Sequence, residues 1–428
     1  MSVIMSILHF IVFSLLSQAS ILVGLMAMIG LILQKKKAVQ VITGTVKTIV
    51  GFLIFGIGSS AAQSALTSFQ TLFTKGFHVE GVLPLAEAVT GQAQTKFPMV
   101  IALVMVCGFA LNLLVARITR FKCIFLTGQH NLFLAAMLTI LFKAMGMSDV
   151  VTVVAGSIIL GFAAAIFPSI AQPYMRKITG HDDIAIGHYC TLAYALSGWL
   201  GSKVGKPEES TEKLKLPGWL SIFKDYVVSV TLSIGVFYYI AAIAAGQANV
   251  EKLSGGIHWL VYPFLQALAF AGGLYVIITG VRMFLSEIVP AFVGISEKFI
   301  PNSKPALDCP VVFPYAPTAT VLGFICSYLA GVACIPFFAA VGLPVIIPVA
   351  IPYFFIGGTA AVFGNATGGW KGAVLSSVVT GILIAVGPAL MYPVMQAVGL
   401  SGTAFPETDF NALGLVIYNL GKLFGLAH

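Results

Sequence analysis

Charged side chains are scarce in this chain. Asp, Glu, Lys and Arg together make up 9% of its 428 residues, whereas about a quarter of the residues in an ordinary soluble domain are charged. Hydrophobic residues make up 58%, and uncharged runs long enough to cross a bilayer, roughly 20 residues each, recur along the whole length. This composition excludes an ordinary soluble protein. It predicts an all-α, multi-pass protein of the lipid bilayer with about eleven transmembrane helices. The candidate spans are 7–33, 38–60, 98–118, 125–145, 149–170, 222–246, 258–281, 316–341, 342–360, 372–396 and 410–425.

The sequence also lacks the short motifs that carry enzymatic chemistry. It contains no HExxH or other zinc-ligand spacing, no CxxC pair, no GxxxxGK[ST] phosphate loop and no GxSxG elbow. These absences argue against zinc catalysis and against an ATP-driven pump made by this chain alone. We expect no metal, no cofactor and no enzymatic activity of its own. Any energy for transport then comes from another protein or from an ion gradient.

The net charge of +8 could suggest a nucleic-acid partner, but the basic residues lie between the apolar runs. Three lysines at 35–37 follow the first run, and Arg176 and Lys177 follow the fifth. Such clusters are typical of the positive-inside rule, under which cytoplasmic connections carry an excess of Lys and Arg. We therefore expect no nucleic-acid partner and a multi-pass membrane protein.

One stretch, residues 203–225, has the composition of an aqueous loop, because it mixes five lysines with three glutamates and Asp225. It is interpreted either as a solvated linker or as a cytoplasmic docking surface for a soluble partner. The loop divides a single integral membrane unit, 1–428, into a first half over about 1–200 and a second over about 226–400. A C-terminal helix is expected over about 410–428.

The two halves share short sequence matches. "VITG" at 41–44 corresponds to "IITG" at 277–280, and "PLAE" at 84–87 corresponds to "PALD" at 305–308, in the same order. Internal duplication with Pro- or Gly-broken segments is a pointer to a transporter with its substrate site near the bilayer midplane. "GNATGGW" at 364–370 is Gly-rich and predicts a turn or a broken helix.

Both four-letter matches end at an acidic residue in apolar surroundings, Glu87 and Asp308. A carboxylate that faces lipid is costly, so these groups are expected to face the protein interior or a water-filled cavity. An acid beside helix-breaking prolines offers an acceptor and backbone donors together, which suits a sugar or polyol. The alternatives are that Asp308 caps a helix start and that Glu87 lies in an exposed loop.

Two further stretches place polar side chains in apolar runs. "FLTGQHNLF" at 125–133 contains Gln129 and His130 and ends at Phe133; "IGHY" at 186–189 contains His188 and Tyr189. Imidazole and amide groups both donate and accept hydrogen bonds, and an aromatic ring can stack on a sugar ring. Core packing explains the same residues equally well.

Several blocks in order resemble one family of membrane proteins. They are "GTVKTIVGF" (44–52), "LTG" (126–128), "IGH" (186–188), "KLPGWLSIF" (215–223), "GVRMFLSEIVPAFVGIS" (280–296), "LDCPVVFPYAPTATVLGF" (307–324) and "GGW" (368–370). Together they resemble the ascorbate-type enzyme IIC, the membrane permease component of the bacterial phosphoenolpyruvate-dependent sugar phosphotransferase system.

The resemblance implies about eleven helices in two inverted repeats and a homodimer, located in the bacterial cytoplasmic (inner) membrane. Each protomer would have a scaffold domain that dimerises and a core domain with broken segments, which moves with the substrate in an elevator-like manner. The implied function is uptake of L-ascorbate or a related sugar. A separate IIB protein, charged through IIA, would phosphorylate the substrate at the cytoplasmic face.

Position by position, Asp308 and His188 match substrate ligands of that family. Other positions depart from it: Gln129 stands where ascorbate members have histidine, with His130 next to it, and Phe133 and Tyr189 stand where glutamines are expected. Glu87 stands where a tyrosine is expected. Because sites built on hydrogen bonds discriminate strongly, these departures leave another sugar, polyol or sugar acid open as the substrate. The rival hypothesis is an ion-coupled secondary transporter in which Glu87 or Asp308 titrates.

Overall fold

A computed structural model describes residues 19–77, 82–213, 226–298, 300–346, 348 and 350–425. Most of the described residues are helical. The first part of the predicted span over 7–33 lies outside the described residues. Residues 214–225, the second half of the 203–225 loop, also lie outside them. The α-helices are α2 (Ala19–Leu33), α3 (Ala38–Phe77), α4 (Ala86–Lys96), α5 (Pro98–Ile118), α6 (Gly128–Ala144), α7 (Asp149–Thr179), α8 (Thr191–Val204), α9 (Tyr226–Ala245), α10 (Gln247–Ser254), α11 (Tyr262–Lys298), α12 (Pro317–Val341), α13 (Ala350–Pro352), α14 (Gly358–Ala397) and α15 (Thr408–Leu423).

Four helices in the described residues are long and apolar enough to cross a membrane. They cover Met99–Ile118, Asp149–Thr179, Pro317–Phe338 and Tyr353–Ala397. Their side chains are only about half buried within the protein, and many of the exposed ones are large and hydrophobic. Exposed hydrophobic side chains of this kind are stable in contact with the lipid hydrocarbon. The predicted helical, multi-pass class is therefore confirmed.

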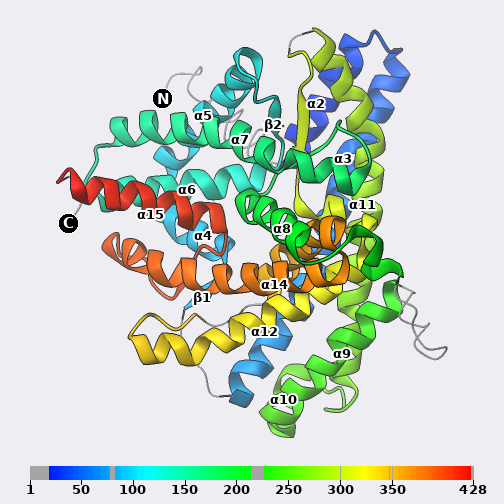
Figure 1. Ribbon diagram of the computed structural model, residues 1–428, viewed down its shortest axis with the longest axis vertical. Helices are drawn as coiled ribbons and strands as arrows, with labels where there is room; N and C mark the ends of the chain where they lie inside the picture. Colours follow the sequence, from blue (N-terminus) through cyan, green and yellow to red (C-terminus); the bar gives the residue numbers. More distant parts are fainter. Residues whose placement is uncertain are drawn as a thin grey trace.

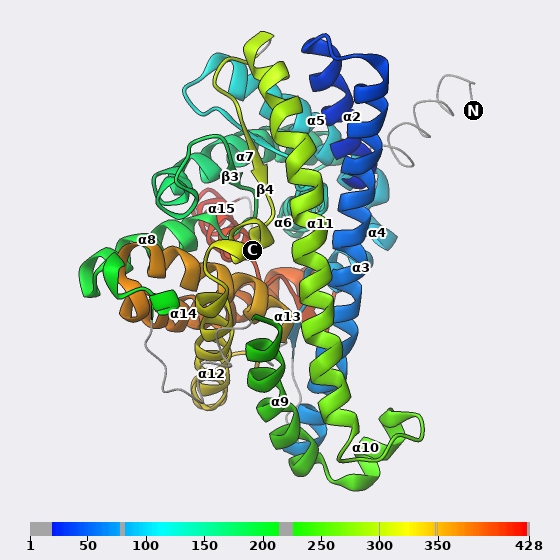
Figure 2. The same cartoon turned by 90° about the vertical axis from the view of Figure 1, so that its right-hand side faces the viewer.

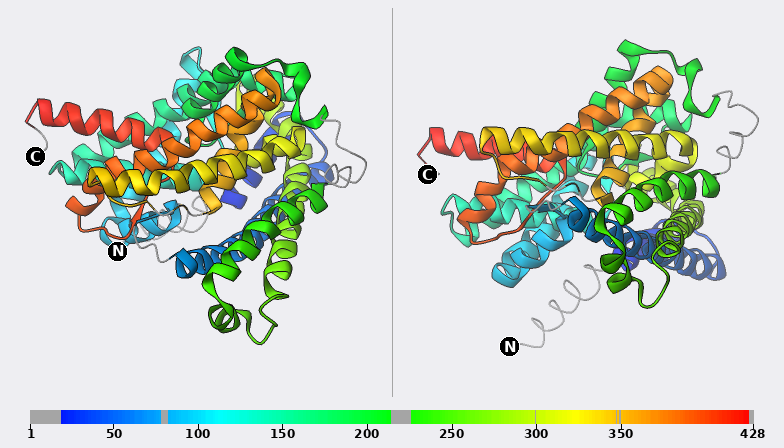
Figure 3. Two further views of the ribbon diagram at one scale, coloured as in Figure 1. Left: turned by 60° about the horizontal axis from the view of Figure 1, so that its bottom comes forward. Right: turned by 90° about the horizontal axis from the view of Figure 1, so that it is seen from below.

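The helices form two groups that run in different directions (Figure 1). In Figure 2, α3 and α11 lie side by side along the longest axis, and α2 packs against both. The second group contains α5, α7, α8, α12 and α14, with α5 packed on α7 and α14 packed on both α8 and α12. Figure 3 shows α12, α14 and α15 (yellow to red) running along one another, while α9 and α10 (green) project to the other side.

Both ends of α7 are stabilised by local sequence. The Ser148 side chain caps α7 by accepting a hydrogen bond from the backbone N–H of Val151, and the helix ends at Gly180, whose φ of 82° is left-handed. Arg176 and Lys177 in the last turn complement the negative end of the helix dipole. The same basic pair that suggested a cytoplasmic connection thus also stabilises a helix end.

Helices α8 and α14 approach closely because glycines face each other. A Cβ atom on Gly201 would lie 2.5 Å from the carbonyl oxygen of Gly364, and one on Gly205 would lie 2.0 Å from that of Gly368. Small residues at such positions are the usual means of bringing membrane helices together. At Gly369, φ is 58° and ψ is −151°, so α14 is broken there, as the "GNATGGW" motif predicted.

Five short strands interrupt the helices within the described residues. β1 (Leu83–Pro84) pairs with β5 (Thr403–Ala404), and β4 (Lys304–Leu307) lies between β2 (Cys123–Phe125) and β3 (Ala185–Ile186). All these pairings are parallel. The three-stranded sheet β2–β4–β3 joins segments that are far apart in the sequence, and its strands end where the predicted site residues begin.

Candidate functional site

The sheet β2–β4–β3 brings three of the polar sequence motifs to one place. Each strand is followed directly by a motif: β2 by Thr127–His130, β3 by Gly187 and His188, and β4 by Asp308. The pairing continues past the strand ends, because Leu126 N donates to Ala306 O over 3.0 Å and Gly187 N donates to Leu307 O over 2.6 Å. Since the strands are parallel, their carboxyl ends lie at the same edge of the sheet.

Asp308 is at the centre of this cluster. Its Oδ1 accepts a 2.7 Å hydrogen bond from the backbone N–H of Cys309 and so caps the 3₁₀ segment η5 (Cys309–Tyr315). Its Oδ2 accepts a 3.1 Å hydrogen bond from Nε2 of Gln129, and His130 Nε2 lies 3.6 Å from Oδ1. The Asp308 side chain is 16% exposed. The capping role proposed as an alternative is therefore real, and it leaves the other carboxylate oxygen facing polar side chains.

The second histidine completes the cluster. The rings of His188 and His130 have centroids 4.2 Å apart, and His188 Nδ1 lies 3.3 Å from the Tyr194 hydroxyl. Both histidines are buried, at 4% and 6% exposure. Buried polar groups in an apolar protein need hydrogen-bond partners, and at the end of the sheet His130 faces Asp308 while His188 faces Tyr194. The arrangement can therefore donate and accept hydrogen bonds toward a polar molecule.

The same residues are also a possible ligand set for a metal ion. Donor atoms of His130, His188 and Asp308 lie within 4.8 Å of one another. Two imidazoles and a carboxylate are ligands that zinc accepts. Motif spacing did not predict this set, because its members come from three separate segments of the chain.

Phe133 and Tyr189 stand in different relations to the cluster. Phe133, one turn after Gln129 on α6, meets the His130 ring edge-to-face at 5.5 Å and forms an apolar wall beside it. The Tyr189 ring is fully buried and stacks on Phe125 at 4.4 Å. Its hydroxyl donates a 3.0 Å hydrogen bond to Oδ1 of Asn131. Tyr189 thus ties the segment after β3 to the start of α6.

Glu87 is the second residue of α4, a helix that packs against α6. Its side chain lies outside the part of the structure that is described. The helix carrying Glu87 is therefore next to the helix that carries Gln129 and His130.

One residue near the site was missed by sequence reasoning. Asp409, in the first turn of α15, is fully buried. Its Oδ2 accepts a 2.7 Å hydrogen bond from Thr191 Oγ1, and its Oδ1 accepts one of 3.2 Å from the backbone N–H of Leu192. It thereby satisfies donors at the start of α8, three residues after His188. The available signal was an acidic residue at the edge of the apolar run over 410–425.

Comparison with known proteins identifies the family of this chain. The family model described as "PTS system sugar-specific permease component" (EIIC-GAT) matches residues 14–409. The "Ascorbate-specific PTS system EIIC component" of Mycoplasma pneumoniae is 29% identical over 423 residues, which cover 86% of this chain and 64% of that protein. This chain thus spans less than two thirds of that relative's length. The family model covers most of the chain, so the resemblance predicted from the sequence blocks is confirmed. The protein belongs to the family of phosphotransferase-system sugar-specific permease components of the galactitol and ascorbate type, which are multi-pass proteins of the cytoplasmic membrane.

Proposed function

We propose that this protein is a permease that takes up L-ascorbate or a related sugar or sugar acid and presents it for phosphorylation by a separate IIB protein charged through IIA. The observation that carries the proposal is the buried cluster of Gln129, His130, His188 and Asp308, which three distant segments form in a chain with 9% charged residues. Polar groups at membrane depth are expensive and are characteristic of substrate pathways.

The chemistry of the cluster suits a polyhydroxylated ring. Asp308 supplies an acceptor for hydroxyl protons, and the two imidazoles and the Gln129 amide both donate and accept. Phe133 lies beside His130 and offers an apolar face. In this proposal Tyr189 orients the segment that bears His188 and does not itself contact the substrate, since its hydroxyl is bonded to Asn131.

The name of the Mycoplasma pneumoniae relative supports ascorbate as the first candidate substrate. The departures at Gln129, Phe133, Tyr189 and Glu87 keep other sugars, polyols and sugar acids open. A carboxamide in place of an imidazole changes the number of donors and acceptors at one position, and a site built on hydrogen bonds converts such changes into large differences in affinity.

We further propose two inverted repeats, a homodimer and an elevator-like movement of the core helices. Two features support the repeats. The "VITG" and "IITG" motifs lie on the two longest helices of their group, α3 and α11, which pack side by side. The "PLAE" motif begins on the last residue of the parallel strand β1, and the "PALD" motif begins on the second residue of the parallel strand β4.

Reconstitution in liposomes tests the function. With purified IIB, IIA and a phosphoryl donor on the cytoplasmic side, labelled ascorbate is expected to accumulate as its phosphate. The same vesicles with only a proton gradient are expected to show no accumulation. Accumulation driven by the gradient alone would favour the ion-coupled alternative. Direct binding to a panel of sugars, polyols and sugar acids would identify the substrate.

A further inference from the structure

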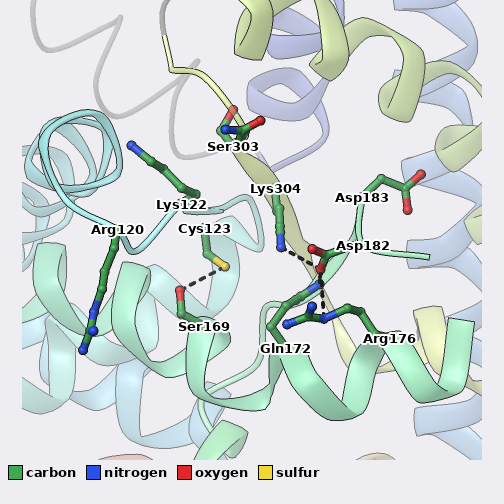
Figure 4. A pocket seen from close by; sticks show the side chains of 11 residues that line it. Arg120, Lys122, Cys123, Ser169, Gln172, Arg176, Asp182, Asp183, Ser303 and Lys304 are labelled. Atoms are coloured by element: carbon green, nitrogen blue, oxygen red, sulfur yellow. Dashed lines mark hydrogen bonds and ion pairs between the residues drawn. The ribbon is translucent and has the colours of Figure 1, made fainter. Parts of the chain in front are cut away.

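A second polar site lies at the opposite ends of the same three strands. A cavity of about 490 Å³ opens where β2 and β4 begin and where the segment before β3 passes. Figure 4 shows its lining side chains, which come from the α5–β2 connection, α7, the segment before β3 and the start of β4. Its volume is within the range of pockets for small ligands, about 300–1,000 Å³.

The cavity has an excess of positive charge. Four cationic side chains line it, those of Arg120, Lys122, Arg176 and Lys304, together with the two carboxylates Asp182 and Asp183. Lys304 Nζ lies 2.6 Å and Arg176 Nε 3.4 Å from the same Asp182 oxygen. Asp183 pairs with His181.

Asp182 forms ion pairs with Lys304 and Arg176 but not with the other two cations. Its partial burial alone would raise its pKa, but hydrogen bonds from Lys304 and Gln172 and the charges of Lys304 and Arg176 outweigh that effect and lower the pKa below its usual value. The carboxylate is therefore ionised at neutral pH. None of the ion pairs in the described residues involves Arg120 or Lys122. Lys122 Nζ donates hydrogen bonds to the carbonyl oxygens of Ala116, over 3.0 Å, and Arg117, over 3.3 Å, at the end of α5.

Two buried polar atoms in the lining have no hydrogen-bond partner. The Ser303 hydroxyl is one, in a residue that is 8% exposed. The other is Oε1 of Gln172, a residue 4% exposed whose Nε2 donates to Asp182 Oδ1 over 2.8 Å and to Ile184 O over 3.0 Å. Because Nε2 has two acceptors, Oε1 is left as an acceptor without a donor. Leaving such groups unsatisfied costs about 1–3 kcal/mol each.

We propose that this cavity binds a small hydroxylated phosphate monoester. Lys304, Arg176 and the Ser303 hydroxyl supply donors for the phosphate oxygens, and Gln172 Oε1 accepts a hydrogen bond from a ligand hydroxyl. Charge-assisted hydrogen bonds to phosphate are the strong ones. Ser303 and Gln172 both line the cavity, so their unpaired atoms favour a small ligand that enters it over a protein surface.

The location gives the site a place in transport, and this step rests on the proposed function. Lys304 begins β4 and Asp308 follows its end, so four residues, or about 13 Å of extended chain, separate the two sites. A phosphorylated sugar released from the candidate substrate site would carry the groups that the cavity recognises. The cavity would then be an exit site for the phosphorylated product.

Titration calorimetry on the purified full-length protein tests the binding site without any transport assay. The probes are glucose 6-phosphate, inorganic phosphate and unphosphorylated glucose. Glucose 6-phosphate is expected to bind at least about five-fold more tightly than either of the others, because only it satisfies both the cations and Gln172 Oε1. Absence of saturable binding, or equal affinity for inorganic phosphate, would overturn the proposal.

Variants locate the bound ligand. Lys304→Gln is expected to weaken glucose 6-phosphate binding about ten-fold and the nearly isosteric Ser303→Ala about five-fold. The matched control is Lys177→Gln, which removes a cation from α7 that lies over the Tyr174 ring and does not line the cavity. Unchanged affinity in both test variants would contradict the assignment.

Asp308→Asn separates this inference from the proposed function. It is expected to reduce substrate affinity at least ten-fold but to leave glucose 6-phosphate binding unchanged, because Asp308 does not line the cavity. If Asp308→Asn removes both, the phosphate ester occupies the candidate substrate site and the second site is disproved. If the phosphate ester binds normally in a protein that binds no sugar, the cavity stands and the proposed function fails.

Discussion

The side-chain amide of Gln129 donates a 3.1 Å hydrogen bond to Oδ2 of Asp308, across a separation of 179 residues. The contact exists because β2 and β4 run parallel in one small sheet and end together. It joins a residue at the start of α6 to the carboxylate that caps η5. Any displacement of one strand along the other would separate donor and acceptor, so the sheet register positions the candidate site.

Asp308→Asn is expected to reduce substrate affinity at least ten-fold while the protein stays folded. The substitution keeps the shape of the side chain but removes the charge that faces Gln129 and His130, and charge-assisted hydrogen bonds contribute about 1.5–3 kcal/mol. Equilibrium binding of labelled substrate to purified protein measures the loss. Asp149→Asn, at a side chain 72% exposed on α7, is the control. Normal binding by Asp308→Asn would show that the site is elsewhere.

Long apolar segments could be predicted from the sequence because transfer of side chains into lipid dominates their energetics. The ends of the helices could not be predicted in this way. The predicted span 38–60 is part of α3, which continues to Phe77 through serines and glutamine, because packing against α11 supports it beyond the apolar run. The last part of the predicted span 342–360 and the whole of the span 372–396 fall in one helical segment, Tyr353–Ala397, which has a break at Gly369.

The candidate site was predictable in its residue types but not in its construction. Polar residues in apolar runs pointed to Gln129, His130, His188 and Asp308, and the structure brings these four together. Strands of two to four residues have too little periodicity to be recognised. The burial of Tyr189 depends on stacking with Phe125 across the sheet, which no local pattern encodes.

Gly187→Ala is expected to reduce substrate affinity about ten-fold although glycine has no side chain to bind a ligand. A Cβ atom there would lie 2.4 Å from the carbonyl oxygen of Ala306, so β3 must move away from β4 and carry His188 away from Asp308. Overpacking of this kind costs about 1–3 kcal/mol. The control is Gly272→Ala on α11, where a Cβ atom would meet nothing within 4 Å. Equal affinities in the two variants would contradict the prediction.

Tyr189→Phe is expected to lower stability more than affinity. Removing the hydroxyl leaves Asn131 Oδ1 without its donor in a buried position, which costs about 1–3 kcal/mol. Thermal unfolding of the detergent-solubilised protein should show the loss, with binding measured below the transition. Tyr275→Phe, at a side chain 58% exposed on α11, is the matched control. A large loss of affinity with unchanged stability would instead make Tyr189 a substrate ligand.

Asp409→Ala is expected to lower the unfolding temperature and also to weaken substrate binding. It removes both acceptors at the start of α8, so the Thr191 hydroxyl and the Leu192 N–H lose their partner. The helix start then becomes free to shift, and His188 lies just before it. Asp409→Asn keeps one carbonyl acceptor and should show a smaller decrease in both quantities. If the alanine variant loses stability but binds substrate normally, α8 does not position His188.

Glu212 ties the loop after α8 to the start of α12. Its Oε1 accepts hydrogen bonds from the backbone N–H groups of Thr318, over 2.9 Å, and Ala319, over 3.1 Å, and its Oε2 accepts one of 2.8 Å from the Thr318 hydroxyl. These amides belong to the first turn of α12, which has no intrahelical acceptors for them. The described part of the 203–225 segment is therefore attached to a helix that packs on α14.

Glu212→Ala is expected to expose those amides to solvent and to cost about 0.5–2 kcal/mol of local stability, the usual range for a lost helix cap. Hydrogen–deuterium exchange followed by mass spectrometry should show faster exchange in peptides that contain Thr318 and Ala319. Glu208→Ala removes an exposed glutamate from the same segment and should leave that exchange unchanged. Equal protection of the α12 start in both variants would mean that the loop does not hold the helix. Faster exchange in the Glu212 variant alone would show that Glu212 holds the start of α12 to the loop.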